Sequence, residues 1–232
     1  MKKSRPSTYI STLLFGITLC VSLPSSADLI SAKRAISDGN GELAIMELSR
    51  LAGMGNSEAQ YELGKLYAQG KLVPEDANRA MLALTLAVEN GFRMAESLRS
   101  AQQKKINLMQ LAALQEQLGT LFQEGGPVAI DPNRATAWLE NRTLNPVPFT
   151  NEERGEVARK IGKIYEEKIF SFTAAHTWYT LAEAFGTERA QKDRKRMELF
   201  LQEKSVSQSR IDAIEKYKSY LKNHKRMVDG KL

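Results

Sequence analysis

Apolar residues recur along the chain at the spacing of an α-helix. One set with the spacing i, i+4, i+7 and i+8 forms a single helix face: Ala59, Leu63, Leu66 and Tyr67. Residues 207–226 alternate apolar and charged positions with a similar period, which predicts an amphipathic terminal helix. No run has the period of two that indicates a half-buried strand. The pattern predicts an all-α chain.

A short pattern with a glycine at its second position occurs three times. It reads Leu-Gly-Lys-Leu-Tyr from Leu63, Leu-Gly-Thr-Leu-Phe from Leu118 and Ile-Gly-Lys-Ile-Tyr from Ile161. An aspartate follows thirteen residues after each of the first two starts, as Asp76 and Asp131. Such internal repetition is typical of stacked units that each consist of a helix pair. The third unit has a shorter inner loop and realigns on its second helix.

Residues at the expected helix ends support this division. Ser57–Gln60 has the form of a capping box at the start of a first helix. Gly70 can end that helix in a left-handed conformation. Asp76 and Asp131 lie where an N-cap oxygen is needed before each second helix, and Pro132 suits a first helical turn.

The repeated glycine lies inside each predicted first helix, at Gly64, Gly119 and Gly162. A glycine in a helix interior costs about 1 kcal/mol relative to alanine. Its recurrence indicates a compensating benefit, which we interpret as close approach of the neighbouring helix.

Two segments depart from the repeat. Residues 96–117 are predicted to form an added helical segment between the first and second units. Residues 145–149 contain two prolines and are predicted to be an extended linker. Thr150 and Glu153 then have the spacing of a capping box that starts another helix.

The first 27 residues resemble a secretory signal peptide. They begin with Lys2, Lys3 and Arg5, continue with an apolar run over residues 9–23 and end with small residues at Ser25 and Ala27. We predict cleavage after Ala27. The alternative is an uncleaved anchor, but the run is shorter than the ~20 residues that span a bilayer.

Cys20 is the only cysteine and lies in this segment, where Leu19 replaces the small residue that a lipoprotein signal needs. We therefore expect a mature chain without lipid or disulfides, located in the periplasm or secreted.

The net charge of +6 overstates how basic the mature chain would be. Without the first 27 residues, the chain has 30 basic and 27 acidic residues. Residues 189–232 alone contain 13 basic and 6 acidic residues. A mildly acidic body therefore has a basic tail. The basic residues of this tail would either lie on a solvated helix face or make weak contact with an anionic surface. Export argues against a nucleic-acid partner.

The repeated residues resemble the Sel1-like repeat family, which is related to the tetratricopeptide repeats. The pattern that carries the resemblance is strongest in residues 57–95 and comprises Ala59, Leu63, Gly64, Tyr67, Gly70, Asp76, Arg79, Ala80, Ala87, Gly91 and Ala95. The resemblance implies an α-solenoid of antiparallel helix pairs. We assign residues 28–190 to this solenoid and residues 191–232 to basic C-terminal helices that cap it.

The sequence lacks the clusters that catalysis or metal binding usually needs. His176 and His224 are the only histidines, and no nucleotide-binding loop or zinc-protease motif occurs. We interpret His176 as a packed or surface helix residue, and Trp138 and Trp178 as core residues. The chain is predicted to be no enzyme and to need no cofactor or metal.

The predicted function is that of an adaptor that binds another envelope or secreted protein, in envelope assembly or signalling. Alternatives are a cell-wall-directed enzyme or penicillin-binding repeat protein, and a secreted factor that acts on a host. Residues of the first helices that the core does not use would line one concave surface. The candidate partner-binding residues are Tyr61, Lys65, Gln69, Glu116, Thr120, Arg159 and Lys163.

Overall fold

The computed structural model describes residues 26–147 and 149–230. The basic start, the apolar run and Cys20 of the predicted signal peptide lie outside the described residues. The first helix, α1 (Ser26–Ser37), begins just before the expected cleavage point after Ala27. Export therefore stays a prediction.

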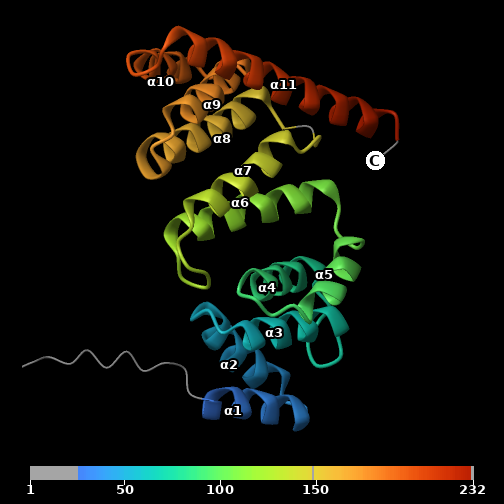
Figure 1. Ribbon diagram of the computed structural model, residues 1–232. Coiled ribbons are helices and arrows are strands. Elements are labelled where there is room, and N and C mark those ends of the chain that lie inside the picture. Colours follow the sequence, from blue (N-terminus) through green and yellow to red (C-terminus); the bar gives the residue numbers. More distant parts are fainter. Residues whose placement is uncertain (1–25, 148, 231–232) are drawn as a thin grey trace, which may run out of the picture.

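The described residues form α-helices and contain no strand. Helices that follow one another pack in pairs, and the pairs are stacked from α1 at one end to α11 at the other (Figure 1). The pairs are α1 with α2 (Gly41–Gly53), α3 (Ser57–Gln69) with α4 (Ala77–Glu89), α6 (Leu108–Glu124) with α7 (Pro132–Leu144), and α8 (Asn151–Ile164) with α9 (Phe172–Ala184). The remaining helices are α5 (Ala95–Gln103), α10 (Glu188–Glu198), α11 (Glu203–Val228) and a short π-helix, η1 (Tyr165–Ile169), that continues α8. The predicted all-α solenoid is confirmed.

The repeated glycines mark where the two helices of a pair cross. A Cβ atom on Gly64 would lie 2.6 Å from Cγ of Leu84 and 3.2 Å from the carbonyl oxygen of Ala80. The other two crossings are equally close. A Cβ atom on Gly119 would lie 2.6 Å from Cγ of Leu139, and one on Gly162 would lie 2.6 Å from Cε1 of Tyr179. The predicted close approach is confirmed.

The start of α3 differs from its prediction. The N-cap is Asn56, whose Oδ1 accepts a hydrogen bond from the Ala59 amide at 2.9 Å, and Ser57 is the first helical residue. The predicted capping box at Ser57 is therefore wrong. Gln60 is fully buried and bonds to other segments of the chain, because Asn56 already caps the helix.

The other predicted helix ends are as expected. Gly70 ends α3 with a φ of 63°. Asp76 and Asp131 cap the second helices, accepting hydrogen bonds from the Arg79 and Arg134 amides respectively. These caps fix where each second helix begins.

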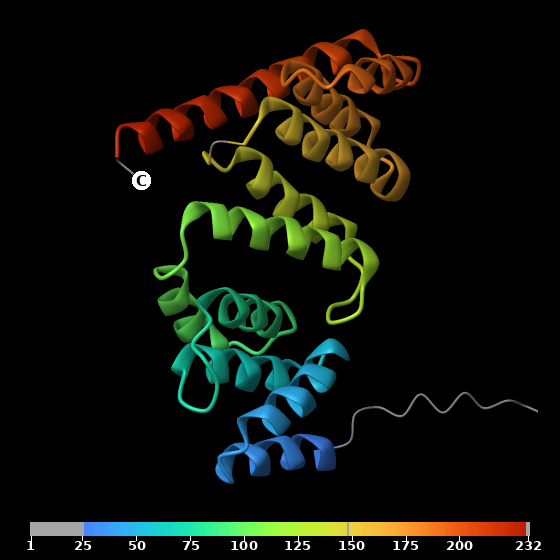
Figure 2. The same cartoon turned by 180° about the vertical axis from the view of Figure 1, so that it is seen from behind.

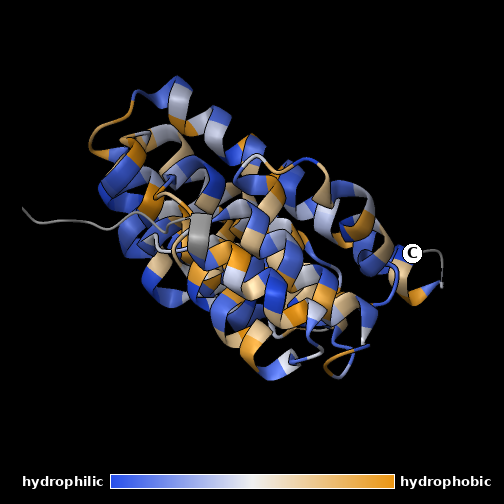
Figure 3. Ribbon diagram, turned by 90° about the horizontal axis from the view of Figure 1, so that it is seen from below, coloured by the Kyte–Doolittle hydropathy of each residue, from blue (hydrophilic) through white to orange (hydrophobic). Residues whose placement is uncertain are grey.

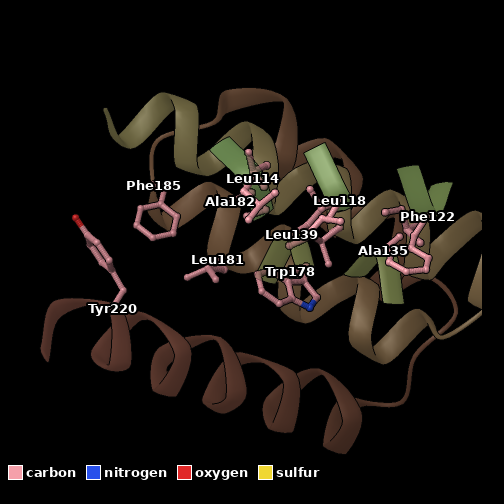
Figure 4. Packing of buried hydrophobic residues seen from close by; sticks show 14 of the residues in the cluster. Leu114, Leu118, Phe122, Ala135, Leu139, Trp178, Leu181, Ala182, Phe185 and Tyr220 are labelled. Atoms are coloured by element: carbon pink, nitrogen blue, oxygen red, sulfur yellow. The ribbon is translucent and has the colours of Figure 1, made fainter. Parts of the chain in front are cut away.

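Two main apolar cores fill the stack. The first joins α1 to α4, and the second joins the later helices, with Leu118, Leu139 and Trp178 near its centre. Tyr220 of α11 reaches into the second core and packs on Phe185, as Figure 4 shows. Hydrophobic and hydrophilic positions are interspersed along the helices that Figure 3 shows, as expected of helices with a packed side and a solvent side. The predicted terminal helix is present as α11, and α10 crosses the predicted domain boundary at residue 190.

The added segment is two pieces rather than one. Asn107 starts α6 with a capping box to Gln110, so α5 and the extended first part of α6 are separate helices. α5 packs against α4 in the way that α8 packs against α7. It therefore covers the side of the first unit on which α6, the first helix of the next unit, would otherwise pack. The views from both sides show α6 standing off from the first unit while the loop after it descends toward that unit (Figures 1 and 2).

Candidate interaction surfaces

The predicted partner-binding residues of α3 are only partly free. The ring of Tyr61 is half-buried and its centroid lies 5.0 Å from that of Phe92. Lys65 lies over the Tyr61 ring, at 5.8 Å from its centroid, and pairs with Glu62 at 3.1 Å. Gln69 is exposed. This part of the surface is shaped by the segment that leads into α5.

The corresponding residues of α6 and α8 lie on neighbouring helices. Lys160 of α8 donates a hydrogen bond to Oγ1 of Thr120 on α6 at 3.2 Å. Glu116 accepts a hydrogen bond from Arg142, and Lys163 is exposed. The second and third units thus share this face.

Arg159 of α8 has a structural partner. Its Nε donates to Oδ2 of Asp193 at 2.7 Å, and the Asp193 side chain is only 8% exposed. Arg159 and Tyr61, which were expected to have no role in packing, therefore contact other parts of the fold. Arg159 links α8 to α10, and Tyr61 links α3 to the loop before α5. The spacing of apolar residues within one helix does not reveal such contacts with other segments.

A groove opens where the first and second units fail to stack closely. It has a volume of about 310 Å³ and is largely apolar. Its wall combines residues from three helices, chiefly Leu63, Tyr67, Leu82, Leu86, Gln117 and Leu121. Leu63 is half-exposed although its register places it toward the core, because α5 rather than α6 packs beside the first unit. We call this feature the inter-unit groove.

Two side-chain amides, those of the buried Gln60 and the half-buried Asn90, hold one end of the inter-unit groove. Nε2 of Gln60 donates to the carbonyl oxygens of Ala52 at 3.0 Å and Pro127 at 2.9 Å. Nδ2 of Asn90 donates to the same Pro127 oxygen at 2.7 Å and lies 2.9 Å from Oε1 of Gln60. The loop between α6 and α7 is thereby bound to the first unit. Buried polar groups that are fully bonded in this way fix a single arrangement.

A second cleft, of about 680 Å³, lies between α7, α9 and α11. Lys216 of α11 forms an ion pair with Glu140 and lies 4.8 Å from the ring centroid of Trp178. Trp178 is only 2% exposed, which confirms it as a core residue, whereas Trp138 is half-buried. The cleft wall therefore combines apolar residues such as Leu144 and Ala174 with hydroxyl groups and the Lys216–Glu140 pair.

His176 belongs to a buried polar cluster. Its Nδ1 lies 2.6 Å from Oγ of Ser209, and its Nε2 lies 3.3 Å from Oε1 of Glu198. Burial lowers the pKa of His176 despite the nearby carboxylate. His176 and Ser209 are both fully buried, so this trio joins α9, α10 and α11 rather than facing a substrate. His176 is a packed residue, as expected.

Ser219 and Lys222 of α11 have the Ser-x-x-Lys spacing of penicillin-recognising enzymes. Both side chains are exposed, in the middle of a continuous helix. Within the described part of the chain no hydrogen bond joins them. Their arrangement gives no support to the enzymatic alternative.

The C-terminal unit also has an apolar tip. Phe170 is 73% exposed in a left-handed conformation with a φ of 59°. Leu199 and Phe200 are also exposed, and Phe172 lies 5.2 Å from Phe200 between ring centroids. Nothing in the repeat pattern distinguished these positions.

The described ranges contain no group of three His, Cys, Asp or Glu side chains placed to hold a metal ion. None of their helices combines the length and apolarity that crossing a membrane requires.

Comparison with known proteins identified a likeness to a solved structure. No family model matches the chain, and no curated protein matches it. One similar structure is "c5321: a protective antigen present in uropathogenic Escherichia coli strains displaying an SLR fold". It is 18% identical, with a TM-score of 0.40, and the match covers 88% of this chain and 51% of that one. The chain thus spans about half the length of that protein.

Proposed function

We propose that this protein is an adaptor that binds a segment of another protein in the inter-unit groove, without catalysis. The observation that carries the proposal is the groove itself, which leaves Leu63, Leu82 and Leu121 only partly buried between two helix pairs. Concave, mostly apolar sites with a few polar groups are the usual places for ligands. In a solenoid such sites bind chain segments of partners.

The chemistry of the groove favours a partner segment with apolar side chains. Leu63, Leu82 and Leu121 offer apolar surface, and burial contributes about 25 cal/mol for each Å² removed from water. Arg79 and Gln117 lie at the margin and are exposed, so they can bond to the backbone of a bound segment. The Gln60–Pro127 bond keeps the loop wall in place, which lowers the ordering cost of binding.

The setting proposed for this binding is the bacterial envelope. The basic start, the apolar run and the small residues before Asp28 support export to the periplasm or the medium. The partner would then be another envelope or secreted protein, in assembly or signalling. The resemblance to Sel1-like repeats supports an interaction role. A soluble protein beginning at Asp28 in the periplasmic fraction or the medium would support export, and an intact N-terminus would contradict it.

Selection from a random peptide library displayed on phage tests the groove. We expect the selected peptides to contain two or more apolar residues and to lose at least tenfold in affinity for a Gln117→Trp variant, whose indole would fill the groove mouth. Gln117 is exposed, so this change should leave the fold intact. Ala137→Trp places the same side chain at an exposed site of α7 and should have no effect. Equal binding to both variants would refute the groove as the site.

A further inference from the structure

The C-terminal helix α11 has more apolar surface than capping the stack requires. One side packs on the body through Ser209, Ala213 and Tyr220, which are buried. A second line of residues, all exposed, runs along the helix at alternating spacings of three and four. This line, here called the outer seam, consists of Ile211, Ile214, Lys218, Leu221, Lys225 and Val228.

The apolar members of the outer seam are open to solvent. Ile211 is 50% exposed and Ile214 53%, while Leu221 and Val228 are 46% and 69% exposed. Single exposed apolar residues are ordinary on a protein surface. Four of them on one line of one helix follow the 3.5-residue repeat by which helices pair in coiled coils.

Positive charge borders the outer seam. Lys218 and Lys225 lie within it, and Lys222 and Arg226 are exposed nearby, so that these cations outnumber the flanking Glu215 and Asp229. None of these four forms an ion pair with another described residue. The neighbouring cations of α11 differ, since Arg210 is bound to Glu198 and Lys216 to Glu140. The charges along the seam are therefore available to an external partner.

We propose that the outer seam binds an amphipathic helix of another protein that presents aspartates or glutamates beside its apolar residues. From Ile211 to Val228 the seam extends about 26 Å at a rise of 1.5 Å per residue. A partner helix of similar length would cover the four apolar side chains, and its carboxylates would meet Lys218, Lys222 and Lys225. Charges at the flanks of paired helices decide which partner is accepted.

The same features disfavour other occupants. In a parallel pair of α11 helices, Lys218 and Lys225 would each face their own copy across the seam. A helix that lies on a membrane needs a continuous apolar face. Here Lys218 and Lys225 interrupt the line of apolar residues.

Titration calorimetry of the purified protein with three synthetic peptides tests the proposal. The first is an amphipathic helix of about three heptads with Ile and Leu in the seam positions and Glu at both flanks. The second carries Lys at the flanks, and the third has the composition of the first in scrambled order. We expect the first peptide to bind at least tenfold more tightly than the other two, and less tightly as salt is added.

Variants place the binding on the seam. Ile214→Asp with Leu221→Asp should weaken binding of the acidic peptide at least tenfold without lowering the melting temperature. Ile130→Asp changes another exposed isoleucine, which is 63% exposed before α7, and should have no effect. Binding that the seam variant leaves intact, or preference for the basic peptide, would overturn the proposal.

Two further measurements distinguish the other occupants. Self-association seen by light scattering and abolished in the seam variant would identify a second copy as the occupant. Sedimentation with phosphatidylserine vesicles that the seam variant loses would identify a membrane surface instead. Either result would overturn the proposal. The inter-unit groove is tested by Gln117→Trp, so the two proposals fail independently.

Discussion

The guanidinium carbon of Arg154 lies 4.2 Å from the ring centroid of Tyr220, so that one cation connects α8 to α11. Arg154 is fully buried. Its Nη1 donates to the carbonyl oxygens of Thr143 and Asn145 at 2.7 Å each, and its Nη2 donates to that of Val147. These bonds hold the extended linker after α7. Burial lowers the pKa of Arg154, but the side chain stays charged at neutral pH because the usual value is so high.

Replacing Arg154 should therefore destabilise the C-terminal half. Arg154→Leu leaves three buried carbonyl groups without their donor, and each such loss costs about 1–3 kcal/mol. We expect urea unfolding to show a loss of at least about 3 kcal/mol. Arg226→Leu, at an exposed position of α11, should change stability by less than about 0.5 kcal/mol. Similar losses in the two variants would show that the linker does not depend on Arg154.

The glycine at a helix crossing gives the second prediction. Gly64→Ala should lower the free energy of unfolding by about 2 kcal/mol, because the new Cβ would meet Leu84 and overpack the crossing. This loss would outweigh the helix-propensity gain of about 1 kcal/mol. Gly53→Ala is the matched control, since a Cβ at the end of α2 would meet nothing within 4 Å. In thermal unfolding, the melting temperature of Gly53→Ala should lie above that of wild type and the melting temperature of Gly64→Ala below it. The reverse order would contradict the close packing of α3 on α4 at Gly64.

The buried histidine predicts how stability depends on pH. The folded state lowers the pKa of His176, so the unfolded chain takes up its proton first as the pH falls. The contribution of neutral His176 is thus complete well above pH ~6.5 and declines below it, by at most about 1.4 kcal/mol per pH unit. His176→Gln should flatten this decline between pH ~7 and ~5 in urea unfolding. Ser209→Ala removes the neighbouring hydroxyl but should keep the slope, and equal slopes in wild type and His176→Gln would refute the assignment.

Much of the fold followed from sequence because the repeat has strong local signals. The glycines at 64, 119 and 162 and the caps at Asp76 and Asp131 each depend on residues close in the chain. Their geometry is set by steric limits and hydrogen bonds within one helix pair. Local pattern therefore sufficed for the pairs and for the terminal helix.

The surfaces were harder to predict because they depend on how the pairs stack. Leu63 has core spacing, yet α5 occupies the side of the first unit where α6 would otherwise cover it. Arg159 looked free because its partner, Asp193, lies in a helix outside the repeat. Gln60 and Arg154 are buried polar residues whose partners include loop carbonyl groups, and no periodic pattern marks such positions.

The last prediction concerns the bond between the two units. Gln60→Met keeps the volume of the side chain but removes one of the two amides that bind the Pro127 carbonyl. Because Gln60 and Asn90 lie on the first unit and Pro127 follows α6, the change should loosen the loop over residues 125–130 more than it disturbs either helix pair. The change removes three bonds of the Gln60 amide, to Ala52, Pro127 and Asn90, and each contributes about 0.5–1.5 kcal/mol. The total loss of roughly 2–4 kcal/mol is below the about 5–15 kcal/mol by which ordinary domains are stable, so the protein should stay folded. Hydrogen exchange should rise in this loop and at the start of α7, while α8 and α9 keep their protection.

The control is Asn78→Met, on an exposed part of α4 away from Pro127, which should leave both the stability and the exchange of the loop unchanged. Unaltered exchange in Gln60→Met would mean that the loop holds its position without the amide. If exchange rises as expected and peptides selected on the wild-type groove also bind more weakly, the amide pair would set the shape of the groove as well as the spacing of the units.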